Sequence, residues 1–273
     1  GEEYGWIGRL ADQMAPSTYQ NFIINVDRTQ SLAVKSKKHV PIVFDHPERY
    51  QREGFYAQKN ILNTITNKND GNEINTSREF LNEIANSANQ SSNLISEAWA
   101  KYTRKVDYGI DPVDLDKIAA LIEADLPTRL YYTAFRDNAF DTHVHQNNLH
   151  TRLLTYASDA IRGFMSDLER MGRADDVVIL VMTEFGRRVP ENTSLGTDHG
   201  SAGPMFILGS SVKGGHYGEI PDLVNGLDDG DNLKYTTDFR SVYATLIDKW
   251  LQVDSKNILR KNFQTFDIFD RTV

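Results

Sequence analysis

The fold of this 273-residue chain is decided by residues 175–200, "DDVVILVMTEFGRRVPENTSLGTDHG". The first eight residues are the most strand-like run in the sequence, and they show little alternation of apolar and polar side chains. That pattern is typical of a strand covered on both faces of a sheet. The loop that follows is rich in charged and turn-forming residues. Such a loop after a buried strand raises the question of whether it forms a functional site.

The sequence on either side of this stretch predicts an α/β protein with a mainly parallel sheet. Further strands are predicted at 21–26, 40–44, 128–135 and 203–209. Helices are predicted at 5–14, 112–126 and 149–171, and a last one near Thr237. Asp111 is a plausible N-cap of the second helix, and Gly172 stands where a C-cap glycine belongs. Helices that alternate with strands in this way favour a parallel sheet.

The chain gives no sign of an internal repeat or a linker. We therefore expect one domain over residues 1–273, with a polar, helical insertion at about 51–108. Apolar residues make up 40% and charged residues 25% of the chain, which is ordinary for a globular protein.

Composition excludes several classes of function. The formal net charge is −8 and no basic stripe offsets it, so nucleic acid is not an expected partner. The longest strongly apolar run, 177–182, is far too short to span a membrane, and "GEEYGWIGRL" does not resemble a signal peptide. The chain has no cysteine, so disulfides and thiolate metal sites are absent and any metal must be held by His, Asp and Glu.

Two polar clusters, 137–148 and 183–199, each follow a predicted strand, and ligands of parallel sheets bind beyond the strand ends. We therefore expect both clusters at the same edge of one sheet. Asp141 and His143 are two residues apart, so in an extended segment they point the same way. Glu184 follows the next strand. Asp198 and His199 end the loop after it. Carboxylates with imidazoles suit zinc, manganese, iron or magnesium, whereas the alternative is a solvated loop with a capping Asp.

Other residues of these clusters have two interpretations each. Arg187 could bind a phosphate or sulfate oxygen in bidentate fashion, or form a salt bridge that shapes the loop. His145 could be a ligand, support a ligand or be exposed. Gln146 could orient a ligand imidazole. His150 lies beside the apolar face of the long helix and is interpreted as structural.

The motifs "FDTHVHQ", "MTEFGRRVPEN", "GTDHGSAGPMFILG" and "VKGGHYGEIPDL" resemble, in this order and spacing, the DUF1501 family. That family is related to the alkaline phosphatase and sulfatase superfamily. The resemblance covers residues 5 to about 251 and is strongest over 140–223. It implies an alkaline phosphatase-like α/β/α sandwich whose carboxyl edge carries metal ions.

Carried over by position, the resemblance implies metal ligands at Asp141, His143 (or His145), Glu184, Asp198 and His199. One departure is clear, because Phe185 stands where the superfamily has a ligating His. Members of the family also carry an upstream portion with a first strand, a "GG-x-D-G" segment and the place for a nucleophile, and nothing like it precedes Gly5. We therefore expect a sheet that is incomplete on its N-terminal side, and a metal that binds weakly or not at all.

These observations lead to three hypotheses of function. The first is a metal-dependent hydrolase-like protein that uses zinc, manganese or a similar ion on a small anionic phosphate or sulfate ester, with Arg187 holding the anion. The second is a non-catalytic descendant of the same fold that serves as a secreted binding or structural protein. The third is a metal-binding module that handles glycans. The resemblance implies a periplasmic or secreted location.

Overall fold

The computed structural model describes residues 3–16, 19–50, 90–228 and 230–270. The chain forms two compact units. Unit 1 comprises Gly1–Ala11, Ala15–Arg104 and Asp116–Thr133, and unit 2 comprises Asp12–Met14, Lys105–Leu115 and Ala134–Val273. Most of the insertion expected at 51–108 lies outside the described residues; of the part inside them, residues 90–101 are helical.

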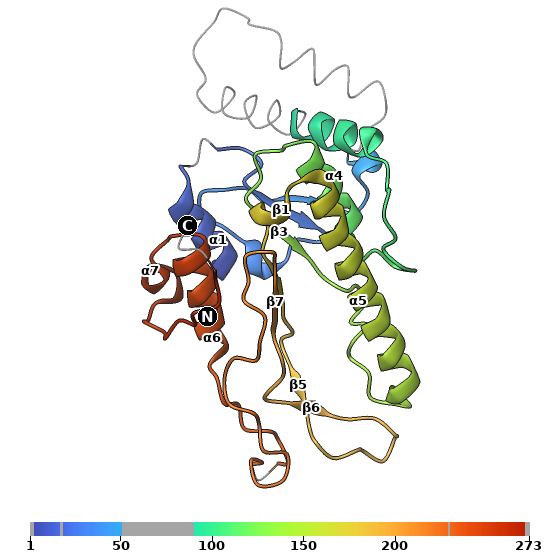
Figure 1. Ribbon diagram of the computed structural model, residues 1–273, viewed down its shortest axis with the longest axis vertical. Coiled ribbons are helices and arrows are strands. Elements are labelled where there is room, and N and C mark those ends of the chain that lie inside the picture. Colours follow the sequence, from blue (N-terminus) through green and yellow to red (C-terminus); the bar gives the residue numbers. More distant parts are fainter. Residues whose placement is uncertain (1–2, 17–18, 51–89, 229, 271–273) are drawn as a thin grey trace, which may run out of the picture. The chain divides into compact units, whose positions relative to one another are not determined.

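Unit 1 contains a three-stranded parallel sheet with the order β2-β1-β3, formed by β2 (Ile42–Phe44), β1 (Ile23–Val26) and β3 (Leu130–Thr133) (Figure 1). All four residues of β1, the central strand, are buried, as expected where a short β-branched run has a neighbour on each side. Unit 1 also contains most of α1 (Trp6–Met14), the helix over residues 90–101, nearly all of α4 (Leu115–Glu123), and the 3₁₀ turns η1 (Leu32–Val34) and η2 (Pro47–Arg49). The predicted strands at 21–26, 40–44 and 128–135 are confirmed.

Asp111 does not cap α4, so that prediction is wrong. Its Oδ1 accepts a hydrogen bond of 2.9 Å from the backbone N–H of Val113, two residues on, which forms a turn instead. Val113 and Asp114 have positive φ values, 51° and 60°, and therefore cannot belong to a right-handed helix. The helix consequently begins at Leu115, three residues later than the predicted start.

Unit 2 contains a pair of antiparallel strands, β4 (Ile179–Val181) and β7 (Phe206–Leu208), and a short antiparallel hairpin of β5 (Gly186–Arg187) and β6 (His199–Gly200). Its other elements are the long helix α5 (Gln146–Met171), the 3₁₀ turn η3 (Ala174–Asp176), α6 (Phe239–Thr245) with the π-helical turn η4 (Leu246–Trp250), and α7 (Ser255–Leu259). Gly172 ends α5 with a φ of 69°, which confirms the predicted glycine C-cap.

The β4–β7 pair packs on a core of Leu246, Ile268 and Phe269. The side chains of Val178, Leu180, Ile207, Val212, Trp250 and Phe266 complete this cluster. Each residue of β4 is only half-buried, so the expectation that this strand is covered on both faces is wrong.

The two predicted polar clusters do not share the edge of one sheet. The first follows β3, which belongs to the parallel sheet of unit 1, and the second follows β4, whose partner β7 is antiparallel. The chain is therefore a mixed α/β protein with a small parallel sheet. The clusters come together within unit 2 because residues 188–198 form the loop of the β5–β6 hairpin.

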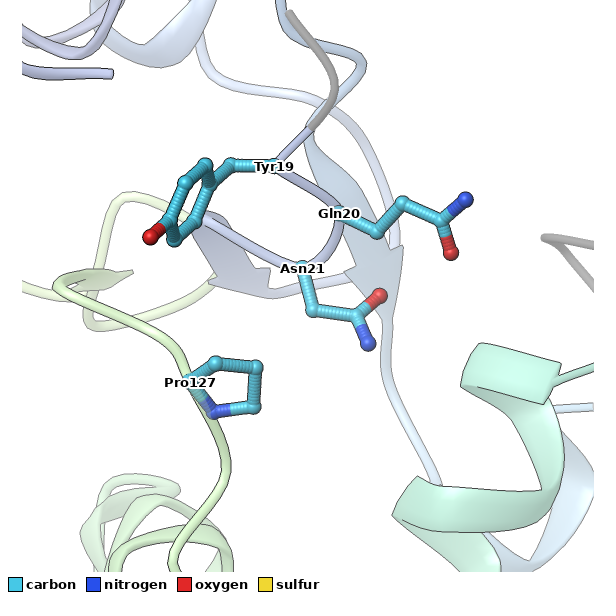
Figure 2. A pocket seen from close by; sticks show the side chains of 4 residues that line it. All are labelled: Tyr19, Gln20, Asn21 and Pro127. Carbon is cyan, nitrogen blue, oxygen red and sulfur yellow. The ribbon is translucent and has the colours of Figure 1, made fainter. Parts of the chain in front are cut away.

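No helix among the described residues is long and apolar enough to cross a membrane. Unit 1 has an open pocket lined by Tyr19, Gln20, Asn21 and Pro127 (Figure 2). These lining residues carry amides, a phenol and a proline ring, so the carboxylates and imidazoles singled out from the sequence lie elsewhere.

Candidate metal centre

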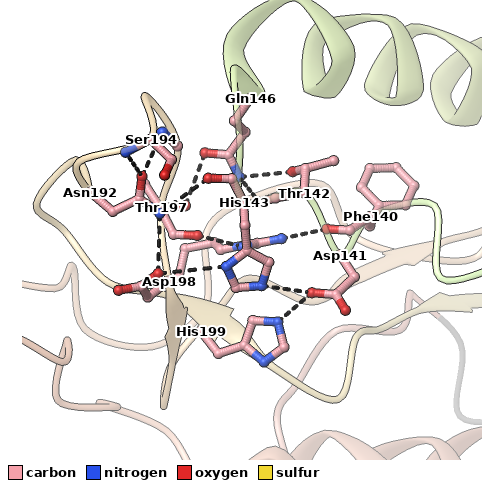
Figure 3. Close-up of polar contacts among 12 residues, drawn as sticks. Phe140, Asp141, Thr142, His143, Gln146, Asn192, Ser194, Thr197, Asp198 and His199 are labelled. Carbon is pink, nitrogen blue, oxygen red and sulfur yellow. Dashed lines mark hydrogen bonds and ion pairs between the residues drawn. The ribbon is translucent and has the colours of Figure 1, made fainter.

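The candidate site lies where the segment before α5 meets the loop between β5 and β6. The backbone N–H groups of His145 and Gln146 donate to the carbonyls of Ser194 and Leu195 at 3.0 and 2.9 Å. The side chain of Gln146 extends this contact. Its Nε2 donates to Oγ1 of Thr142 at 2.9 Å, and its Oε1 accepts from the hydroxyl of Thr197 at 2.9 Å (Figure 3). Gln146 therefore ties the two segments together, rather than touching a ligand imidazole.

Two glycines permit close backbone approaches at the site, one between the loop and the segment before α5 and one between β5 and the residues that follow β6. A Cβ added at Gly196 would lie 2.2 Å from the carbonyl oxygen of His143, and one added at Gly186 would lie 1.6 Å from that of Ala202. Both distances are far below van der Waals contact, so the backbone can pass only where no side chain is present. Glycine at these two positions is thus required by packing and not by backbone conformation.

Asp141, His143 and His199 each offer one donor atom, and the three atoms all lie within 4.8 Å of one another. Oδ1 of Asp141 lies 2.9 Å from Nε2 of His143 and 2.6 Å from Nε2 of His199 (Figure 3). The three side chains are 37, 40 and 45% exposed, respectively, so the group is open to solvent. The structure therefore brings together three of the five ligands proposed from the sequence.

Asp198 lies on the other side of His143. Its Oδ1 is 3.5 Å from Nδ1 of that imidazole and accepts a hydrogen bond of 3.1 Å from Nδ2 of Asn192. The same amide nitrogen of Asn192 is 3.1 Å from the carbonyl oxygen of His143, while its Oδ1 accepts from the backbone N–H groups of Ser194 and Gly196. Asn192 thus organises the loop and holds Asp198 beside the imidazole.

The surrounding donors keep both carboxylates ionised. The pKa of Asp141 is lowered, chiefly by the hydrogen bond from His199, with a smaller contribution from His143 and some opposition from desolvation. The pKa of Asp198 is lowered as well, mainly by the hydrogen bond from Asn192. Both carboxylates therefore carry negative charge at neutral pH, which favours a cation between these side chains.

Arg187 braces the two segments. Its two terminal nitrogens donate to the carbonyl oxygens of Thr197, at 2.7 Å, and Phe140, at 2.5 Å. Thr197 precedes Asp198 and Phe140 precedes Asp141, so one guanidinium connects the backbone next to two of the proposed ligands. Burial lowers the pKa of Arg187, and the charges of Asp141 and Asp198 oppose that effect. The observed bonds correspond to the loop-shaping interpretation of this residue, with backbone carbonyls as its partners.

The other residues singled out from the sequence lie outside the donor group. Glu184 and His145 are exposed, and neither belongs to the set of three donors. His150 packs edge-on against Phe140, with ring centroids 5.4 Å apart, and its Nδ1 lies 3.2 Å from the hydroxyl of Thr142. Burial lowers its pKa, with Arg187 adding to the effect. These contacts agree with the structural interpretation of His150.

Sequence reasoning missed the contribution of Phe185 and Asn192. The ring of Phe185 stacks on that of His199, with centroids 3.8 Å apart and planes inclined by 10°. Asn192 was not singled out, because an Asn in a loop is commonplace. The spacing of Asn192 to Ser194 and Gly196 is the local signal that could have indicated an Asn-centred turn.

Comparison with known proteins gives one positive finding. The family model described as "Protein of unknown function (DUF1501)" matches residues 16–261. Neither the search of curated proteins nor the search of solved structures returned a match.

Proposed function

The chain belongs to the DUF1501 family, and on this premise we propose that it is a metal-dependent hydrolase-like protein that acts on phosphate or sulfate esters. The observation that carries the proposal is the convergence of Asp141, His143 and His199. The resemblance to the DUF1501 family is strongest over residues 140–223, and the relation of that family to the alkaline phosphatase and sulfatase superfamily supports the fold, the chemistry and a periplasmic or secreted location as parts of this proposal.

The donor set fits a divalent ion such as zinc. One carboxylate oxygen and two imidazole nitrogens are common zinc ligands, and three protein ligands leave a further position open, as in catalytic zinc sites. Two ligands that each lie about 2.0–2.2 Å from one ion are at most about 4.4 Å apart. The three donor atoms lie within 4.8 Å of one another, so small side-chain rotations bring them into that range.

Metal binding also fixes where the imidazole protons reside. An imidazole nitrogen binds a metal only without its proton, so a metal at Nε2 of His143 leaves the proton on Nδ1. That nitrogen lies 3.5 Å from Oδ1 of Asp198. A carboxylate on the far nitrogen is the usual support of a ligating histidine. We therefore assign Asp198 the role of orienting His143, in place of the direct ligand role expected from the sequence.

When bound, the ion would polarise the ester oxygen of a substrate and stabilise the negative charge that develops on it. The remaining functions fall to the chain. Asp141 supplies the charge that retains the ion, and Asp198 holds the His143 proton at Nδ1. Arg187 adds a fixed positive charge close to Asp141 and Asp198, which favours an anionic ester over a neutral one.

The rival hypothesis is a non-catalytic descendant of the same fold that serves as a secreted binding or structural protein. It is favoured by the exposure of the three donor side chains, since an open site excludes little water from a reaction. Bound metal together with ester turnover separates the two hypotheses, because only the hydrolase requires both.

The experiment is to load the metal-free protein with zinc or manganese and measure hydrolysis of 4-nitrophenyl phosphate and 4-nitrophenyl sulfate. We expect turnover that depends on the metal and is lost in Asp141→Asn and His199→Ala. His216→Ala is the matched control, because His216 is exposed and lies outside the donor group. Bound metal without turnover of either ester would favour the non-catalytic alternative. Absence of bound metal would refute the metal-dependent hydrolase.

A further inference from the structure

We propose that Phe185 is a positioning residue that orients His199 for metal binding. This inference rests on the proposed function. Phe185 cannot itself ligate a metal, and we assign it the role of holding the imidazole of His199, which can.

The register of the β5–β6 hairpin places the residues concerned on one face. Arg187 pairs directly with His199, so their side chains project to the same side of the hairpin. Phe185 lies two residues before Arg187 and therefore projects to that side as well. It is the diagonal neighbour of His199, a separation that aromatic side chains can bridge.

The observed contact is a stack. The rings of Phe185 and His199 have centroids 3.8 Å apart and planes inclined by only 10°. The stack covers one face of the His199 imidazole and leaves the edge of that ring, which carries the nitrogen atoms, accessible to polar groups. Nε2 on that edge lies 2.6 Å from Oδ1 of Asp141. The imidazole is 45% exposed, and its other ring contact, with His143, is tilted by 37° at a centroid distance of 4.8 Å, so Phe185 supplies the closest ring contact that orients it.

Phe185 is itself held in place. The Cζ atom of Arg187 lies 5.1 Å from the centre of the Phe185 ring, and Arg187 is fixed by its bonds to the carbonyls of Thr197 and Phe140. The order of contacts therefore runs from the backbone beside the ligands, through Arg187 and Phe185, to the ring of His199. Partners that fix the orientation of a ligating histidine typically change metal affinity by about 10- to 100-fold.

The test is the zinc affinity of Phe185→Leu by isothermal titration calorimetry, with thermal unfolding as a check on folding. We expect about 10- to 100-fold weaker binding, near-complete rescue in Phe185→Tyr, and no change in Phe206→Leu. Phe206 is a suitable control because it is an exposed phenylalanine in β7. The double variant Phe185→Leu/His199→Ala should bind no more weakly than His199→Ala alone. Phe185→Met provides a second ring-free variant should the leucine variant fail to fold.

A second readout needs no metal. Stacking places the His199 ring protons in the shielding zone of Phe185, so their proton resonances should lie upfield in the wild type and move downfield in Phe185→Leu. Wild-type zinc affinity in Phe185→Leu, or an additive loss in the double variant, would refute the positioning role. If the wild type binds no zinc, the proposed function fails and this role fails with it. The resonances still distinguish the cases, since equal shifts in both proteins would refute the stack too.

Discussion

A single carboxylate oxygen, Oδ1 of Asp141, lies within hydrogen-bonding distance of two imidazole nitrogens, those of His143 and His199. Without a metal, the imidazoles can donate protons to this oxygen. With a metal, the same three atoms can turn to the ion instead. The same three side chains can therefore hydrogen-bond to one another without an ion and can also act as ligands when an ion binds.

The loop that carries Asp198 depends on the side chain of Asn192. In Asn192→Ala we expect the pKa of Asp198 to rise towards its ordinary value, because the bond from Asn192 is the largest cause of its depression. A carbon-detected NMR titration of the Asp198 carboxyl would measure the change. Asn148→Ala, at an exposed position of α5, is the control. A pKa of Asp198 that stays unchanged in Asn192→Ala would contradict the role given to this amide.

The ligand types were predictable from the sequence, and some of their surroundings were not. Asp141 and His143 lie two residues apart, so local geometry alone placed them side by side. His199 could be added because it ends a charged loop that the motifs singled out. Glu184 looked equivalent on the same grounds, yet the donor group forms without it. The role of Phe185 depends on the register of β5 with β6, which follows from long-range pairing and not from spacing in the sequence.

At the scale of elements, the β5–β6 hairpin positions the site more than any sheet edge does. Its loop contacts the segment before α5 through backbone bonds and through the closely packed Gly196. In Gly196→Ala the new Cβ would lie 2.2 Å from the His143 carbonyl oxygen, whereas in Gly214→Ala it would meet no atom within 4 Å. We expect the first substitution to lower the free energy of unfolding by about 1–3 kcal/mol, as overpacking typically does, and the second to leave it near the wild-type value.

Chemical denaturation of the two glycine variants measures this difference, and zinc titration shows whether His143 has moved. Equal stability and equal zinc affinity in the two variants would mean that the loop does not pack on His143 as described.

The N-terminus of α6 gives a prediction about pH. Oδ1 of Asp238 accepts from the backbone N–H of Arg240 at 2.9 Å, and the Arg240 side chain is the main cause of its lowered pKa. A carboxyl whose pKa is lowered by folding stabilises the protein above its unfolded pKa of about 3.9, and that contribution is lost as pH falls through the folded pKa. Asp238→Ala should therefore cost about 1 kcal/mol near neutral pH and progressively less in acid.

Denaturation of Asp238→Ala at neutral pH and in acid would measure this dependence. Glu169→Ala, an exposed position on α5, is the control. A cost that stays constant across this pH range would contradict the charge-dependent cap.

Elements with strong local signals were predicted well, and so was the parallel pairing of β1 with β2 and β3, but the pairing of β4 was not. Gly172 marks the end of α5, and each predicted strand exists. The apolar stripe of α5 is misleading at its start, because Leu149 is exposed while Phe164 and Leu168 are buried. Helical periodicity records which face is apolar, but not where along the helix other elements cover it. The antiparallel pairing of β4 with β7 likewise depends on contacts that no local pattern specifies.

At the scale of the whole molecule, a bound ion should stabilise the fold. A ligand that binds only the native state adds about 2.7 kcal/mol to the free energy of unfolding at 100 times its dissociation constant. We expect zinc to raise the thermal unfolding temperature of the wild type and of His216→Ala, and to raise that of His199→Ala by much less, because this variant keeps only two of the three donors. The same shift in His199→Ala would place the ion somewhere else in the chain.

The most direct test is X-ray absorption spectroscopy of the zinc-loaded protein, which counts the imidazoles around the ion. We expect nitrogen and oxygen ligands at about 2.0–2.2 Å. Two imidazoles should be present in the wild type and His216→Ala, and one in both His143→Ala and His199→Ala. An imidazole count that is unaffected by either of these last two substitutions would contradict a metal centre at Asp141, His143 and His199.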